Sequence, residues 1–147
     1  MQGTRPPLEA ARAIGRLAPG GPWIGFGLRG DEWRYLLGAD AGVRDVPADA
    51  DLLLALAIAH FAEAFDEAPP DIEATQSDLS ALVAHLIDAE RDAGRRALLG
   101  EALDAIDDGL AGDAVAARLV AARSPGSDRV DPIDQVLLAA RELTEGG

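Results

Sequence analysis

Two short patterns in this chain place a histidine three residues before a carboxylate. They are His60-x-x-Glu63 and His85-x-x-Asp88, and each falls in a stretch with helical periodicity. Residues three apart share one face of a helix, so each pair would present an imidazole and a carboxylate together. Both groups are ligands for several divalent metals. A metal site that joins the two pairs is the first chemistry to consider.

The helical phase argues against this metal site. His60 lies about 120° around its helix from the apolar stripe that contains Ile58, at 3.6 residues per turn. His85 lies about as far from the stripe that contains Leu86. If the two stripes meet in a core, the polar pairs point away from each other. We therefore predict no metal and no cofactor here, and interpret both histidines as surface residues with acidic neighbours.

Three other motifs are better explained by local structure than by ligand binding. GFGLRG, residues 25–30, matches a dinucleotide fingerprint as a string, but that mechanism needs a helix to start within it, and a strand is expected here. RGD, residues 29–31, is interpreted as turn chemistry. DAIDDG, residues 104–109, resembles a calcium loop in composition only, because the alternating ligands and closing glutamate are missing. It reads as a solvated helix end.

Composition narrows the classes of function. The chain has 147 residues, no cysteine and a formal net charge of −13. Disulfides and thiolate metal sites are excluded, and the charge argues against nucleic acid or an anionic membrane as a partner. Residues 1–22 show no signal-peptide pattern, and the longest apolar stretch, residues 52–59, is far shorter than the ~20 residues of a membrane span. We expect a soluble cytoplasmic protein with a single domain, residues 1–147.

The stretch that organises the chain is a predicted β-hairpin over residues 23–37, with Gly30 and Asp31 as a two-residue turn. Alternation then places large apolar side chains from both strands on one face, which helices must cover. We expect that face to pack on the aromatic end of the next helix, at Phe61 and Phe65. The expected strand pairs are Arg29–Glu32, Leu28–Trp33, Gly27–Arg34, Phe26–Tyr35, Gly25–Leu36 and Ile24–Leu37.

The predicted fold is α+β and predominantly α. A hairpin or three-strand meander, residues 23–46, packs on a bundle of four to six helices within residues 49–145. The N-terminal stretch 8–17 is expected to be a short helix. Further helices are expected over 51–67 with an aspartate cap, over 77–110 as two helices broken near Gly94 or as one bent helix, from a cap at Asp113, and from Asp131-Pro132. The expected apolar stripes of these helices include Leu110 and Leu137.

For function, the sequence favours a non-enzymatic protein-interaction module with an acidic surface, such as an adaptor, inhibitor or small subunit. The partner would be a protein, and the acidic charge would suit a basic one. The predicted interaction surface is the second face of the hairpin, unless residues 8–17 fold over it. Its residues are Trp23, Gly25, Gly27, Arg34 and Leu36.

Two alternatives stay open. One is a metal-dependent hydrolase or small-ligand binder that uses acidic helical residues such as Glu63, Glu67 and Asp88. This alternative requires a cleft in which histidines and carboxylates converge. The other is an acidic surface that competes with nucleic acid for a basic protein, which requires carboxylates gathered on one face.

Overall fold

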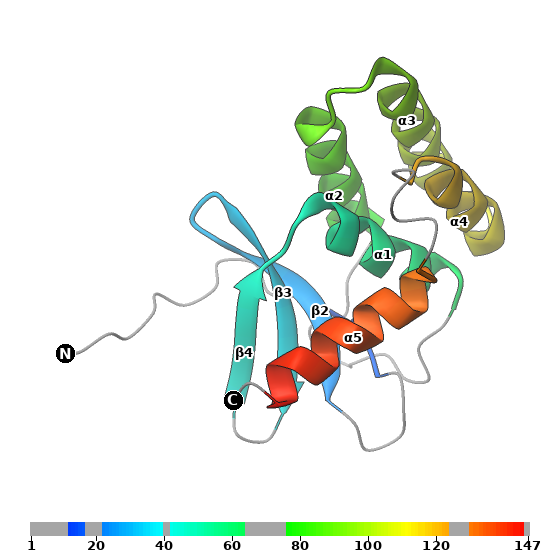
Figure 1. Cartoon of the computed structure of the whole chain (residues 1–147). Helices are drawn as coiled ribbons and strands as arrows, with labels where there is room; N and C mark the ends of the chain where they lie inside the picture. Colours follow the sequence, from blue (N-terminus) through cyan, green and yellow to red (C-terminus); the bar gives the residue numbers. More distant parts are fainter. Residues whose placement is uncertain (1–11, 17–21, 40–41, 64–75, 124–129, 146–147) are drawn as a thin grey trace.

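The computed structural model describes residues 12–16, 22–39, 42–63, 76–123 and 130–145, which form an α+β fold that is mainly α (Figure 1). A four-stranded antiparallel sheet comes first, and its strands are ordered as in the chain. The strands are β1 (Arg12–Gly15), β2 (Trp23–Arg29), β3 (Glu32–Ala39) and β4 (Gly42–Pro47). The described helices are α1 (Ala50–Phe61), α2 (Gln76–Ala89), α3 (Ala93–Asp107), α4 (Gly112–Ala121) and α5 (Pro132–Glu145). The predicted fold class is confirmed, and none of these helices is long and apolar enough to cross a membrane.

β2 and β3 form the predicted hairpin in the predicted register. Arg29 is opposite Glu32 at the turn, and Ile24 is opposite Leu37 at the other end. Gly30 has a φ of +66°, which glycine adopts without the steric cost that other residues incur. β4 adds the third strand that the sequence allowed, and it pairs with β3 along the whole of its length.

Residues 12–15 form a strand, so the helix predicted over residues 8–17 is wrong for this stretch. β1 pairs antiparallel with β2 and places Ala13 opposite Gly25. Gly25 lets the two backbones come close, because a Cβ at this position would overlap the carbonyl oxygen of Arg12. A helix this short gains little stability in water, whereas pairing with β2 satisfies the backbone groups of both strands.

α1 is the central helix of the fold. Every side chain from residue 53 to residue 59 is buried, and the helix contacts α2, α4 and α5. Asp49 is its N-cap and accepts a hydrogen bond of 2.8 Å from the backbone N–H of Leu52. Other helices cover α1 on several sides, which explains why its sequence has no polar face.

The C-terminal end of α1 lies earlier than predicted. The helix ends at Phe61, and Glu63 has a φ of +57°, which takes the chain out of the helical path. The predicted helical extension to Glu67 is therefore wrong at residues 62 and 63, while residues 64–67, and with them Phe65, lie outside the described residues.

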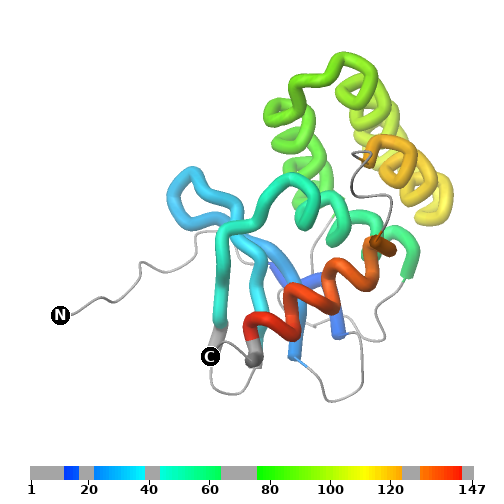
Figure 2. Tube along the Cα trace, viewed as in Figure 1, coloured from blue at the N-terminus to red at the C-terminus, as the bar shows by residue number. Residues whose placement is uncertain are grey.

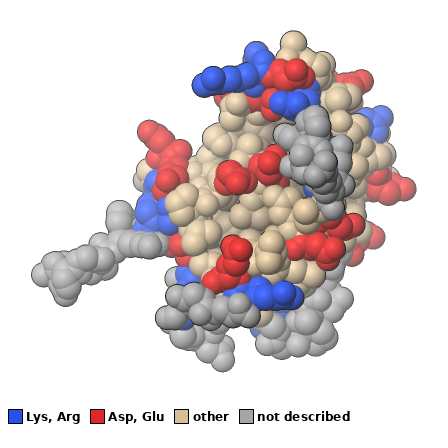
Figure 3. Space-filling model, in the orientation of Figure 1, with Lys and Arg blue, Asp and Glu red and all other residues tan. Residues whose placement is uncertain are grey.

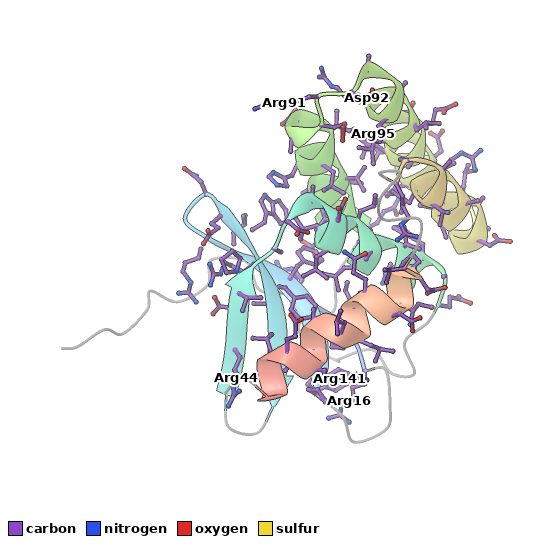
Figure 4. All side chains as sticks on the ribbon, viewed as in Figure 1. Arg16, Arg44, Arg91, Asp92, Arg95 and Arg141 are labelled. Atoms are coloured by element: carbon purple, nitrogen blue, oxygen red, sulfur yellow. The ribbon has the colours of Figure 1, made fainter. Side chains whose placement is uncertain are left out.

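α5 lies across the sheet and alongside α1 (Figure 1 and Figure 2). The hydroxyl of Tyr35 in β3 donates a hydrogen bond of 3.1 Å to the carbonyl of Val136. The guanidinium of Arg44 in β4 donates one of 2.7 Å to the carbonyl of Leu143, and Figure 4 shows Arg44 beside that end of α5. One cluster of buried side chains extends from Ile14 in the sheet to Val136. Sheet and helices thus share a core.

A break separates α2 from α3, as the pattern near Gly94 predicts. Asp92 is the N-cap of α3 and accepts a hydrogen bond of 2.9 Å from the backbone N–H of Arg95. The side chain of Arg95 forms an ion pair of 2.9 Å with Glu90, across the connection shown in Figure 4. These contacts begin a new helix rather than continuing a bent one.

Three helical details differ from the sequence prediction. Asp113 is not the N-cap of α4, because Ala111 occupies that position and Asp113 lies in the first turn. Leu110 is 45% exposed, since it follows the end of α3 and lies outside the helix that would have buried it. Leu137 is 40% exposed, because α5 places Val136 in the core and the next residue is about 100° further around the helix.

The approach of α4 to the end of α1 gives a stability prediction. Gly112→Ala is expected to lower the free energy of unfolding by about 2 kcal/mol, because its Cβ would lie 2.5 Å from the carbonyl oxygen of Phe61. Gly100→Ala in α3 is the matched control, since its Cβ meets nothing within 4 Å. It is expected to raise stability by about 0.5–1 kcal/mol. Urea unfolding followed by circular dichroism measures both changes, and equal effects would contradict the close α1–α4 approach.

Candidate functional site

Most of the predicted interaction surface is covered within the chain itself. The hairpin register places Gly25 beside Leu36 and Gly27 beside Arg34, and all four residues are buried. The backbone of Arg12 occupies the space next to Gly25. β1 and β4 pair with the two outer sides of the hairpin, so its edges are also largely occupied. The sheet therefore leaves little of this surface open to a partner.

Trp23 is the one member of the predicted surface that is half-buried rather than buried. The guanidinium carbon of Arg16 lies 4.0 Å from the centroid of the Trp23 ring. A cation over the face of an indole ring is attracted by the ring quadrupole. Trp23 thus already has a contact within the chain, next to β1.

The sheet also carries a buried ion cluster. Arg34 in β3 donates from Nε to Asp45 in β4 at 2.7 Å, and its Nη2 lies 2.7 Å from the same carboxylate oxygen. Arg29 in β2 approaches the other oxygen of Asp45 with its Nη2, at 2.6 Å. Arg34 also pairs with the exposed carboxylate of Glu32. Asp45 therefore links the hairpin to β4 through two guanidinium groups.

The electrostatics of this cluster favour the ionised carboxylate. Burial alone would raise the pKa of Asp45, but hydrogen bonds and charges from Arg29 and Arg34 outweigh it and hold that pKa below its usual value. Nε and Nη1 of Arg29 are buried without a hydrogen-bond partner, so Asp45 is the main anchor of this arginine. The two positive charges of Arg29 and Arg34 balance the two negative charges of Asp45 and Glu32. We therefore interpret the cluster as structural.

The two histidine–carboxylate pairs do not have the surroundings that the sequence predicts. His60 is in α1, but Glu63 lies beyond the end of that helix, so the two residues do not share a helical face. His85 in α2 is not a plain surface residue. Its ring stacks on that of Trp33, with centroids 4.9 Å apart and an angle of 27° between the ring planes. The tip of the hairpin thus packs on α2, through a contact that helical phase alone did not indicate.

The Trp33–His85 stack has a consequence that depends on pH. Burial lowers the pKa of His85 below its usual value, although the charge of Asp88 partly opposes this shift. Because the folded pKa lies below the unfolded one, the unfolded state binds the proton more readily. Stability is therefore expected to fall as pH decreases from about 6.5 through the lower pKa of the folded protein.

NMR titration of the His85 imidazole tests this expectation. In Trp33→Ala the ring is more exposed, so its pKa is expected to rise toward the usual value. In Asp88→Asn a stabilising charge is lost, so the pKa is expected to fall further. A wild-type pKa at the usual value, unchanged in both variants, would contradict the stacked arrangement.

The described residues bring no group of three or more histidine, cysteine, aspartate or glutamate side chains together in a way that could hold a metal ion. The segment that resembles a calcium loop is the end of α3. Gly109 has a φ of +73°, its N–H donates to the carbonyl of Ile106, and the N–H of Leu110 donates to that of Ala105. This pair of bonds is the Schellman motif, which accounts for the glycine.

Exposed apolar side chains are confined to one part of the described chain. All of the large hydrophobic side chains that are exposed there lie between residues 110 and 138. They are Leu110, Val120, Val130, Leu137 and Leu138. Among the described residues of this region, the exposed carboxylates are Asp113, Asp131 and Asp134, and the exposed arginine is Arg118. The segment from residue 110 to residue 138 thus carries exposed apolar side chains as well as exposed carboxylates.

Acidic side chains are spread over the face shown in Figure 3 rather than gathered at one place.

Comparisons with protein-family models, curated proteins and solved structures find no match.

Proposed function

We propose that this chain is a cytoplasmic, non-enzymatic protein-interaction module that binds a basic protein through the outer side of its helical part. The observation that carries the proposal is the confinement of the exposed large hydrophobic side chains to residues 110–138, within an acidic surface. Exposed apolar side chains with polar surroundings occur at many protein-binding surfaces.

α4 is the helix that we assign to this contact. Leu110 lies just before it and is 45% exposed, and Val120 lies in its last turn and is 44% exposed. Burying such side chains against a partner provides about 25 cal/mol per Å² of apolar area. The buried side of α4 stays in the core through Val115 and Leu119. The helix can therefore bind a partner without a change in its own packing.

The net charge of −13 would affect the rate at which the chain associates with its partner. Complementary charge mainly raises the association rate, and it is screened over ~8 Å at physiological salt. A basic partner is expected to associate more slowly as salt rises, while loss of apolar contacts speeds dissociation. These two effects separate the role of the acidic surface from the role of Leu110 and Val120.

A pull-down with the full chain as bait, from cells that naturally contain it, tests the proposal. The double variant Leu110→Asp/Val120→Asp removes two apolar groups and adds two negative charges. The variant Ala81→Asp/Ala97→Asp adds the same charge at exposed positions of α2 and α3, and serves as the matched control.

Mass spectrometry of the captured material is expected to show a basic protein that wild type and control retain and the α4 variant loses. A partner retained equally by all three baits, or the absence of any protein that depends on the bait, would contradict the proposal.

A further inference from the structure

The outer face of α5 has a self-complementary pattern. Asp134, Leu137, Leu138 and Arg141 are all exposed, and they lie within about 100° of one another around the helix axis. The opposite side of α5 carries Val136, which is fully buried. α5 is in front of the sheet in Figure 1, and Figure 4 shows Arg141 on its C-terminal half. This face is distinct from the α4 contact described above.

The order of these residues is symmetric about the midpoint between Leu137 and Leu138. Asp134 comes three residues before Leu137, and Arg141 comes three residues after Leu138. A two-fold axis through that midpoint would place Leu137 against the second copy's Leu138. It would also place Asp134 of each copy opposite Arg141 of the other, which gives two charged contacts. A two-fold interface requires this kind of self-complementarity, in which i contacts j and j contacts i.

The charges select the antiparallel arrangement. In a parallel pairing, Asp134 would lie beside the second copy's Asp134 and Arg141 beside its Arg141, and like charges in contact disfavour association. In the antiparallel pairing, both charged contacts are attractive, and the two leucines form an apolar centre. Leu138 is 50% exposed, the largest value among the exposed large hydrophobic side chains of the described chain.

We propose that α5 joins two copies of this chain in an antiparallel homodimer centred on Leu137 and Leu138. A single helix of 14 residues provides a small contact, about 21 Å long. Small interfaces belong to weak or transient complexes. The dimer therefore forms at high protein concentration and dissociates on dilution.

Sedimentation velocity of the full chain over a wide concentration range tests the dimer. The single variants Asp134→Arg and Arg141→Asp each replace attractive contacts by repulsive ones. Each is expected to weaken dimerisation about tenfold or more. The double variant Asp134→Arg/Arg141→Asp exchanges the charges and restores both contacts. It is expected to dimerise within about threefold of wild type.

Circular dichroism melting of each variant verifies that these exposed substitutions leave the fold intact. Restoration in the charge-exchanged variant, with loss in both single variants, supports the antiparallel dimer. A wild-type chain that stays monomeric at every concentration would overturn it. So would single variants that dimerise as wild type does, because the charged pairs would then be absent from the interface.

These outcomes are independent of the pull-down. The α5 variants leave Leu110 and Val120 in place, and the α4 variants leave the α5 face unchanged. The dimer and the partner contact can therefore fail separately.

Discussion

Tyr35→Ala is expected to lower the free energy of unfolding by about 4 kcal/mol. The Tyr35 side chain is fully buried at the centre of the sheet, and its hydroxyl donates to the carbonyl of Val136 in α5. Burial also raises the pKa of Tyr35, so the phenol stays protonated and remains a hydrogen-bond donor at any ordinary pH. Truncation leaves a cavity between the sheet and α5.

Two variants separate the parts of this effect. Tyr35→Phe removes only the hydroxyl and is expected to cost about 1 kcal/mol. Leu138→Ala removes an exposed side chain from the outer face of α5 and is expected to change stability by no more than about 0.5 kcal/mol. Urea unfolding measures all three variants. A Tyr35→Ala protein as stable as Leu138→Ala would mean that the core between sheet and α5 is not packed as described.

Asp45→Ala is expected to cost about 3–5 kcal/mol, because it leaves the largely buried guanidinium group of Arg29 without its carboxylate and leaves Arg34 with only the exposed carboxylate of Glu32. Arg34 is 7% exposed and Arg29 is 16% exposed, so water cannot fully replace the lost partner. Asp31 is the matched control. It lies in the same hairpin but is exposed at the turn, and Asp31→Ala is expected to change stability by no more than about 1 kcal/mol.

The same cluster predicts how stability depends on pH at the acidic side. The pKa of Asp45 in the folded protein lies below its usual value, so the unfolded state takes up the proton first. The contribution of Asp45 is therefore present above pH ~4 and is lost as pH falls through the lower folded pKa. Asp45→Asn is expected to flatten this part of the stability profile. A profile identical to that of wild type would contradict the buried pairing.

Local patterns predicted the hairpin register because two neighbouring features agree on it. Gly30 at the turn and the alternation from Phe26 to Tyr35 both select the observed pairing. The aspartate N-cap of α1 and the break near Gly94 were predictable for the same reason, since caps and breaks depend on residues close in the chain.

Contacts between distant segments were not predictable in this way. β1 forms because the bare backbone at Gly25 accepts a neighbouring strand, and its own short sequence does not show this. The position of His85 was predicted from the apolar stripe of its own helix, but Trp33 reaches it from the sheet. The ion cluster is an exception that the sequence could have indicated. A third strand that pairs Leu36 with Asp45 brings the Asp45 carboxylate next to Arg34.

A protein partner is proposed to bind the outer side of the helical part, at α4. Site-specific photo-crosslinking in living cells tests it most directly, with a photo-reactive amino acid at the position of Leu110. The same amino acid at the position of Asp31, exposed at the hairpin turn, is the control. We expect position 110 to give one crosslinked product with a basic protein, and position 31 to give none. No product at position 110, or the same product at both positions, would contradict the claim.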